Sequence, residues 1–271
     1  MAAMQDSTLH LPRIICLHGG GTNARIFRLQ CRVLESTLRS TFRLVYVEAP
    51  FTSQPGSDVT SVYKNHGPFK SWLRITSSDV AHEPRHIIDS INTAIATAMY
   101  ADTQSGATGE WVALLGFSQG AKLAASILFA QQSMQQRAGP NAVIWPNFRF
   151  AVLMAGRGPL VWLLPEKNDD SSSISAALVD AASPSIGGHE PDIPIDSDEH
   201  VLRIPTVHIH GLRDPGLRTH RALLSNYFEE DLVSVVEWEG DHRIPIKRKD
   251  VDAVVKEIYS LAKLTGVLDT W

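Results

Sequence analysis

The sequence predicts an α/β fold, a mainly parallel sheet with helices on both faces. Short apolar runs rich in β-branched residues recur along the 271 residues, as expected for strands covered on both sides. Between the runs, apolar residues repeat with the period of a helix. Strands that alternate with helices build a parallel sheet with right-handed crossovers. We expect six strands, at residues 13–17, 43–47, 111–115, 150–154, 206–209 and 233–238.

The helical period is clearest in two of the connecting segments. Apolar residues recur at one-turn spacing over residues 87–99, before the third predicted strand, and over 251–262, after the sixth. The third strand, WVALL, runs through a sharp turn into another helical segment, AKLAASILFAQQ. We find no internal repeat and expect one domain over residues 1–271.

Two stretches interrupt the alternation of strands and helices. Residues 51–82 are turn-rich but aromatic, which favours an ordered loop beside the sheet. Residues 156–202 are too long for an ordinary connection, and we expect a short helical piece near 174–182 with a mobile remainder. Both follow strands, at the edge where open α/β sheets bind ligands, so we expect 156–202 to act as a lid.

Composition excludes several classes of protein. Lys and Arg number 25 against 29 Asp and Glu, a net charge of -4, which argues against nucleic acid as a partner. No segment has the composition of a secretory signal or a membrane span, so we expect a soluble, cytoplasmic protein without a membrane partner. Cys16 and Cys31 have no ligand or redox spacing, and we expect neither a disulfide nor a cofactor.

A G-x-S-x-G pattern follows the third predicted strand, with Ser118 between Gly116 and Gly120. In such a turn the serine hydroxyl is held above the sheet, and glycines are needed because strand and helix pack closely. The five residues alone are a weak signal, but the flanking strand and helix strengthen it. The pattern predicts that Ser118 is a nucleophile.

A serine nucleophile needs a base and an acid, which on this architecture follow in the order acid, then histidine. Asp214 comes just after the fifth predicted strand and His242 just after the sixth. Taken alone, Asp214 could instead cap a helix, and His242 could instead lie in a surface turn. Their joint order and placement favour a triad with Ser118. Asp241, next to His242 in the chain, is poorly placed to reach its ring.

The turn after the first predicted strand, HGGG at residues 18–21, is suited to binding an oxyanion. We expect one donor to be the backbone N–H of Gly20, with Gly21 next, and the other to be that of Gln119. His18 is expected to be structural. The turn lacks the glycine spacing of phosphate-binding loops.

His208 and His210 share one face of the fifth predicted strand, as two metal ligands would. A third ligand at suitable spacing is missing, so we expect both side chains in the core and no metal site.

Five segments together resemble the fungal serine hydrolase family: CLHGGGTNARIFRLQ, GPFKSWLR, LLGFSQGAKLAA, HGLRDP and GDHRIP. This resemblance implies a compact α/β-hydrolase fold. It carries the nucleophile onto Ser118, the acid onto Asp214, the base onto His242 and the oxyanion turn onto Gly20 or Gly21. Members of the family include carboxylesterases and stand-alone thioesterases of fungal polyketide clusters, which release a finished chain from its carrier protein.

We therefore expect a serine hydrolase that acts on an acyl thioester or ester through an acyl-enzyme. Water, an internal hydroxyl or an outside alcohol would end the cycle, giving an acid, a lactone or an ester. Two alternatives stay open: a carboxylesterase on small free esters, and a non-catalytic binding protein of the same fold.

Two further sets of residues are candidates for contact with the substrate or its carrier. Phe69, Trp72 and Phe117, with LVWLL at 160–164, would wall the site, although core packing explains them equally well. Arg25, Arg28 and Arg32 follow the oxyanion turn at helical spacing and would dock an acidic acyl carrier protein. Their alternative is a solvated face or pairing with Glu35 and Glu48.

Overall fold

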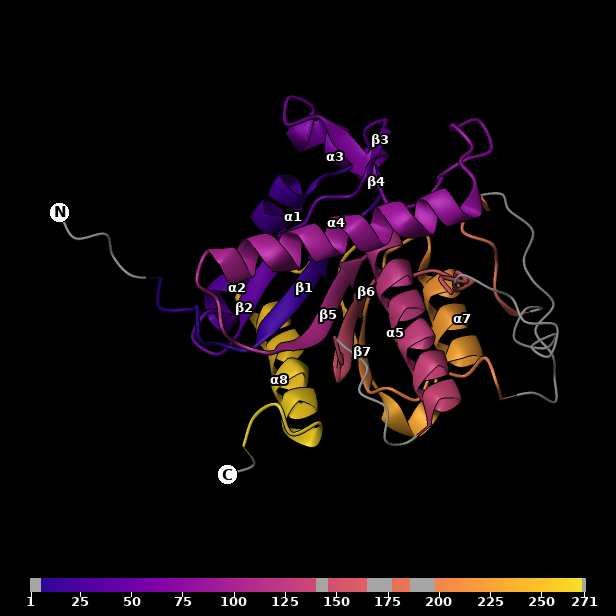
Figure 1. Ribbon diagram of the computed structural model, residues 1–271. Helices are drawn as coiled ribbons and strands as arrows, with labels where there is room; N and C mark the ends of the chain where they lie inside the picture. The colour runs from indigo at the N-terminus through magenta and orange to yellow at the C-terminus, as the bar shows by residue number, and fades with distance from the viewer. Residues whose placement is uncertain (1–5, 140–145, 165–176, 186–197, 270–271) are drawn as a thin grey trace.

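The six apolar runs form one parallel sheet in the computed structural model (Figure 1). The structure describes residues 6–139, 146–164, 177–185 and 198–269. The strand order is β2-β1-β5-β6-β7-β8. The strands are β1 (Arg13–Leu17), β2 (Arg43–Val47), β5 (Trp111–Phe117), β6 (Phe150–Met154), β7 (Thr206–Gly211) and β8 (Val233–Trp238). The six predicted strands are confirmed, and β5 and β7 each extend two residues further.

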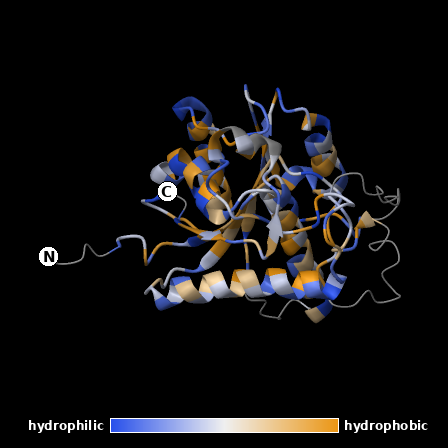
Figure 2. Cartoon of the chain, turned by 90° about the horizontal axis from the view of Figure 1, so that it is seen from above, coloured by the Kyte–Doolittle hydropathy of each residue, from blue (hydrophilic) through white to orange (hydrophobic). Residues whose placement is uncertain are grey.

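Helices cover both faces of the sheet. Figure 2 shows the long helix α4 along one side, with the strands between it and the helices of the other side. One face packs against α4 (Pro84–Gln104), α5 (Gln119–Ala138) and α7 (Leu217–Tyr227). The other packs against α1 (Ala24–Gln30), α2 (Arg32–Leu38) and α8 (Arg248–Leu264). A short 3-10 helix, η2 (Glu230–Leu232), precedes β8.

The apolar runs are continuous because successive residues of a strand point to opposite faces, and both faces are buried. In β5, Leu114 packs into the core on the α5 side, whereas Leu115 packs into the core on the α8 side. β1 behaves in the same way, with Ile15 on one side and Ile14 on the other. The three-layer architecture therefore follows directly from the pattern of the sequence.

The first insertion has more regular structure than the ordered loop that we expected. It contains β3 (Phe51–Ser53), α3 (Ser57–Tyr63) and β4 (Phe69–Ser71), and β3 pairs with β4 in an antiparallel hairpin. The hairpin is fastened to the glycine turn after β1, because the Gly21 N–H donates to the Lys70 carbonyl oxygen at 2.9 Å. The Lys70 N–H returns a bond to the Thr22 carbonyl oxygen at 2.6 Å.

The second insertion differs from expectation where it is described. The side chains of Leu160, Val161 and Trp162 are buried in the core on the α5 side, and Val161 forms a β-bridge with Val179. Of the helical piece predicted near 174–182, residue 177 is helical, residues 178–182 form a bend, a bridge and a turn, and residues 174–176 lie outside the described residues. The other parts of that prediction, including the mobile remainder, fall largely on residues 165–176 and 186–197, which lie outside the described residues.

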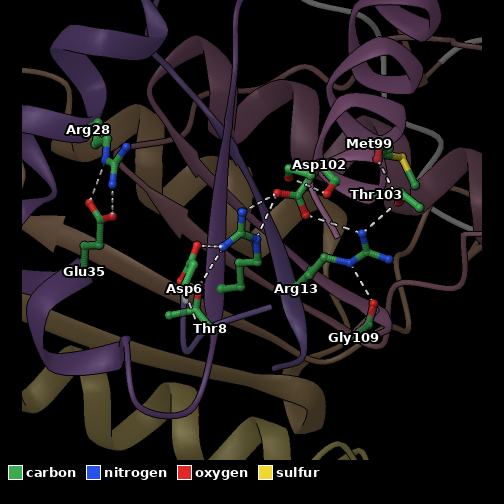
Figure 3. A network of polar contacts seen from close by, with 11 residues as sticks. Asp6, Thr8, Arg13, Arg28, Glu35, Met99, Asp102, Thr103 and Gly109 are labelled. Carbon is green, nitrogen blue, oxygen red and sulfur yellow. Dashed lines mark hydrogen bonds and ion pairs between the residues drawn. The ribbon is translucent and has the colours of Figure 1, made fainter. Parts of the chain in front are cut away.

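A buried ionic cluster ties the amino ends of β1 and β2 to the last turn of α4. Figure 3 shows Arg13 and Asp102 turned toward each other, with an Arg13–Asp102 contact of 3.3 Å. Arg43 holds the other carboxylate oxygen of Asp102 at 2.7 Å and also contacts Asp6 at 2.7 Å. These permanent charges fix the edge of the sheet opposite to the one where Ser118 lies.

Two smaller features concern the cysteines and the hydropathy of the helices. Cys16 and Cys31 are buried free thiols, as predicted, and burial raises the pKa of both. Within the described ranges, no helix is long and apolar enough to cross a membrane.

Candidate active site

Ser118 lies in a tight elbow between β5 and α5. Its φ of 53° is in the left-handed region, which a non-glycine residue adopts at a cost in strain. A side chain at Gly116 would collide with the Gly120 backbone, and one at Gly120 would collide with the Leu17 carbonyl. The Ser118 N–H donates to the Met154 carbonyl oxygen at 2.8 Å, which anchors the elbow to β6. The spacing of the motif therefore reflects a real close approach of strand and helix.

The structure brings Ser118, His242 and Asp214 into one hydrogen-bonded line. Ser118 Oγ lies 3.0 Å from His242 Nε2, and His242 Nδ1 lies 2.7 Å from Asp214 Oδ2. Because an ionised carboxylate only accepts, the His242 proton belongs on Nδ1, and Nε2 is left to accept from the serine hydroxyl. Asp241 instead pairs with Arg243, at 3.5 Å.

The carboxylate of Asp214 is buried just before α7. Its Oδ1 accepts the Gly216 N–H at 2.7 Å, so the helix-start role considered from the sequence exists beside the contact with His242. Burial alone would raise the pKa of Asp214, but the bonds from Gly216, His220 and His242 outweigh it and lower the pKa. Asp214 is therefore held as an anion.

His220 is the member of this cluster that sequence reasoning missed. It lies on α7, fully buried, with Nε2 2.9 Å from Asp214 Oδ2 and Nδ1 2.8 Å from the Gly156 carbonyl oxygen. The sequence signal was its spacing in DPGLRTH, because a helix that begins after Asp214 turns His220 back toward it. His220 thus joins Asp214 to the loop after β6.

Each ring nitrogen of His220 faces an oxygen. A carbonyl oxygen only accepts, so the contact with Gly156 places a proton on Nδ1. On balance burial lowers the pKa of His220, although the bonds to Asp214 and Gly156 act in the opposite direction. The ligand atoms of Asp214, His220 and His242 lie within 4.8 Å of one another, a grouping that a metal could use. Contacts of 2.7 and 2.9 Å are, however, ordinary hydrogen-bond lengths.

The oxyanion donors differ in availability. The Gly21 N–H is engaged by Lys70, so Gly21 is corrected from a candidate donor to a fastening point of the β3–β4 hairpin. Among the described residues, the backbone N–H groups of Gly20 and Gln119 have no acceptor, and both residues line the cavity that contains Ser118. The pair Gly20 and Gln119 is left as the candidate.

The side chain of Gln119 holds the first insertion in place. Its Oε1 accepts the N–H groups of Trp72 at 2.8 Å and Leu73 at 3.3 Å, and its Nε2 donates to the Leu73 carbonyl oxygen at 2.9 Å. Trp72 is fully buried, and its indole N–H donates to the His18 carbonyl oxygen at 2.8 Å. The prediction that Trp72 walls the substrate site is therefore wrong, and the core alternative holds. His18 is buried and structural, as expected.

A cavity of about 1250 Å³ opens beside Ser118 and His242. Phe117 lines it, and the Phe117 ring lies 5.1 Å from the His242 ring. Phe69 and the 160–164 segment do not line it, which corrects both predictions. The first insertion supplies most of the outer wall, through residues 53–56, 59, 62, 63, 75, 76, 78 and 79. Of the expected lid, only Arg157, Gly158 and Ser185 line the cavity in the described part of the chain.

The three arginines expected to dock a carrier protein do not share one helix. The helix breaks at Cys31, so Arg25 and Arg28 lie on α1 and Arg32 begins α2. Arg28 pairs with Glu35 at 2.9 Å, which is the alternative considered from the sequence. Arg25 is exposed, and Arg32 lines the rim of the cavity. Arg28 is therefore corrected to an internal ion pair.

The histidines of β7 belong to the core. His208 and His210 are both buried, and burial lowers the pKa of His208 to about 3 and that of His210 to about 4. These neutral rings meet edge to face, with centroids 6.0 Å apart. The core interpretation of the sequence is confirmed.

Comparison with known proteins places the chain in a family. Residues 6–254 match the family described as "Serine hydrolase (FSH1)". The chain is 68% identical to Esterase dbaE of Emericella nidulans, over 98% of this chain and 96% of that protein. It is 54% identical to Esterase pigG of Monascus ruber, over 97% of this chain and 96% of that protein. Zea mays acyl-protein thioesterase 2 has a similar fold, with a TM-score of 0.51 at 17% identity over 95% of this chain and 96% of that one. The chain therefore belongs to the serine hydrolase (FSH1) family, and it is an enzyme of the serine hydrolase class with an α/β-hydrolase fold.

Proposed function

We propose that the protein is an esterase or thioesterase that forms an acyl-enzyme on Ser118. The observation that carries the proposal is the line of hydrogen bonds from Ser118 Oγ through His242 to Asp214, at 3.0 and 2.7 Å. The names of the relatives, both of which are esterases, support the same class of substrate. A binding protein without catalysis has no need for this alignment.

In the first half-reaction, Ser118 Oγ attacks the acyl carbonyl carbon while His242 Nε2 takes the hydroxyl proton. Asp214 keeps His242 in the tautomer that accepts this proton and stabilises the imidazolium that results. The N–H groups of Gly20 and Gln119 stabilise the tetrahedral oxyanion. The carbon–oxygen or carbon–sulfur bond then breaks, and the leaving group takes its proton from His242.

In the second half-reaction, a hydroxyl attacks the acyl-enzyme and returns its proton through His242 to Ser118 Oγ. Attack by water gives an acid, whereas attack by a hydroxyl of the acyl chain gives a lactone. Analysis of the products by mass spectrometry separates the two, because the lactone is lighter than the acid by one water.

A bulky acyl chain delivered by an acyl carrier protein is the finer proposal. The cavity of about 1250 Å³ exceeds the roughly 300–1,000 Å³ of ordinary small-molecule sites, which favours a polyketide or fatty acyl chain over a small free ester. Arg32 at the cavity and the exposed Arg25 on the preceding helix offer cations to an acidic carrier with its phosphopantetheine phosphate. Replacing both with glutamate should lower kcat/KM on a carrier-bound substrate, and least at high salt. An equal loss on the matching N-acetylcysteamine thioester would exclude docking at these residues.

The acyl-enzyme is tested by covalent labelling. A fluorophosphonate should modify one serine, and peptide mass spectrometry should locate the adduct on the peptide that contains Ser118. Turnover of a panel of thioesters and p-nitrophenyl esters, with acyl chains of increasing length, then identifies the preferred class. A protein that hydrolyses the panel without labelling at Ser118 would contradict the proposal.

A further inference from the structure

Lys122 is a buried cation next to the nucleophile, and the mechanism above does not use it. It lies one turn along α5 from Ser118, and its backbone N–H donates to the Ser118 carbonyl oxygen at 3.1 Å. Its residue is only 4% exposed, yet it lines the same cavity as Ser118 and His242. Lys122 therefore lies in the inner wall of the site and not at its rim.

The ammonium of Lys122 has no hydrogen-bond or ion-pair partner among the residues that the structure describes. The acids that line the cavity are occupied or exposed. Asp79 accepts the N–H groups of Ile75 and Thr76, Asp241 pairs with Arg243, and Glu239 is exposed. Burial lowers the pKa of Lys122 to about 8, so the side chain still carries its proton at pH 7. An unpaired ammonium on a side chain that is almost wholly buried is costly, and proteins normally supply it with an anion.

A second cation lines the same cavity. Arg157 lines the cavity, and its Nε is buried without a hydrogen-bond partner in the described ranges. Its guanidinium packs against Gly216, close to where a side chain at that position would be. Lys122 and Arg157, neither with an ion-pair partner among the described residues, thus both line the cavity.

We propose that Lys122, with Arg157, forms a subsite for an acidic oxygen on the acyl group of the substrate. That oxygen belongs to a carboxylate or to the ionised hydroxyl of an enol or phenol, because these supply a charge-assisted hydrogen bond to an ammonium. The Lys122 N–H is bonded to the Ser118 carbonyl oxygen and both residues line one cavity, so we place the acidic oxygen on the acyl group, on the same side of the site as the carbonyl that Ser118 attacks. This inference rests on the proposed function and specifies its substrate class.

The test compares matched acyl groups that differ in one acidic oxygen. N-Acetylcysteamine thioesters of adipic acid, free at its second carboxyl, and of hexanoic acid form one pair. The 2-hydroxy-4-methoxybenzoyl and 2,4-dimethoxybenzoyl thioesters form another. The readout is the ratio of kcat/KM for the acidic member to that for the neutral member. Lys122→Met removes the charge at similar length, Lys122→Arg keeps it, and Lys263→Met removes an exposed charge on α8 as a control.

We expect the wild-type protein and Lys263→Met to favour the acidic member of at least one pair. In Lys122→Met that ratio should fall by roughly thirtyfold, as when one partner of a buried charge pair is removed, and Lys122→Arg should keep most of it. A ratio unchanged in Lys122→Met, or a wild-type preference for the neutral member of both pairs, would overturn the subsite.

A binding measurement separates this inference from the proposed function. In a Ser118→Ala background, adipic acid monoamide should bind more tightly than hexanamide by calorimetry, and adding Lys122→Met should abolish the difference. Equal binding of the two amides would refute the subsite even if Ser118 is labelled and active. Conversely, failure of Ser118 labelling would refute the acyl-enzyme while leaving this binding result intact.

Discussion

Asp102 and Asp214 are both buried carboxylates, but they lie at opposite edges of the sheet and have different partners. Asp102 is held by the guanidinium groups of Arg13 and Arg43 at the amino ends of β1 and β2. Asp214 is held by the imidazoles of His220 and His242 beyond the carboxyl ends of β7 and β8. A guanidinium keeps its proton at any physiological pH, whereas an imidazole exchanges its own. A buried aspartate therefore stabilises the fold at one edge of the sheet, where it is Asp102, and takes part in proton transfer at the other, where it is Asp214.

The largest expected effect separates the two acids by activity. Asp214→Asn should lower kcat by roughly 10⁴-fold, because the amide no longer fixes the useful tautomer of His242. Ser118→Ala should reduce turnover at least as much, since the covalent route is lost. Asp102→Asn should leave kcat nearly unchanged. Steady-state assays on one thioester measure all three, and a comparable loss of kcat in Asp102→Asn would break the comparison.

The next effect separates the two acids by stability. Asp102→Asn leaves the buried Arg13 guanidinium without its anion, while Arg43 keeps Asp6, and we expect a loss of roughly 3 kcal/mol in the free energy of unfolding. Denaturant unfolding followed by circular dichroism gives the value. Ser118→Ala serves as the matched variant that removes activity without removing a buried charge. If Asp102→Asn unfolds at the same denaturant concentration as Ser118→Ala, the structural role of the arginine cluster is wrong.

The third prediction concerns the loss of folding stability at low pH. His208 and His210 have pKa values near 3 and 4 in the folded protein and 6.5 as the ordinary value. Below pH 6.5 the unfolded chain binds protons that the folded chain does not, so stability falls as the pH falls toward 4. At pH 5 each histidine should cost about 2 kcal/mol of stability relative to pH 8.

His208→Phe removes one of these groups while retaining a flat ring against Phe228, whose ring lies 4.6 Å away. It should recover about half of the loss at pH 5. His10→Phe, at an exposed position, is the control. Equal acid sensitivity of His208→Phe and the wild type would show that other groups drive the unfolding.

The smallest expected effect concerns His220, a positioning residue that acts through Asp214. His220→Leu removes one hydrogen bond to the carboxylate and should lower kcat about tenfold, with little change in KM. His220→Gln keeps a donor for Asp214 and should recover most of the activity. If both variants instead lose thermal stability and kcat together and KM changes as well, His220 acts through packing alone.

The roles of residues that lie within or next to a strong sequence motif were predictable. The roles of residues that reach their position through folding of distant segments were not. The elbow at Ser118 and the loops with Asp214 and His242 follow from strand ends that parallel topology must gather at one edge. Trp72 and the 160–164 segment were misassigned because an apolar or aromatic side chain in an insertion suits a site wall and a core equally. Arg28 was misassigned because Cys31 divides the helix and Glu35 lies within reach of the guanidinium.

The sequence by itself determined the six strands of the main sheet along the chain, the sharp turn at Ser118 and the order of the nucleophile, acid and base. Each depends on local periodicity or on a motif a few residues long. Only the tertiary structure decided that Lys70 engages Gly21, that His220 supports Asp214, and that Lys122 faces the cavity unpaired. The physical reason is that hydrogen-bond partnership and burial depend on which segments, distant in the chain, are packed together, and a single sequence does not contain those distances.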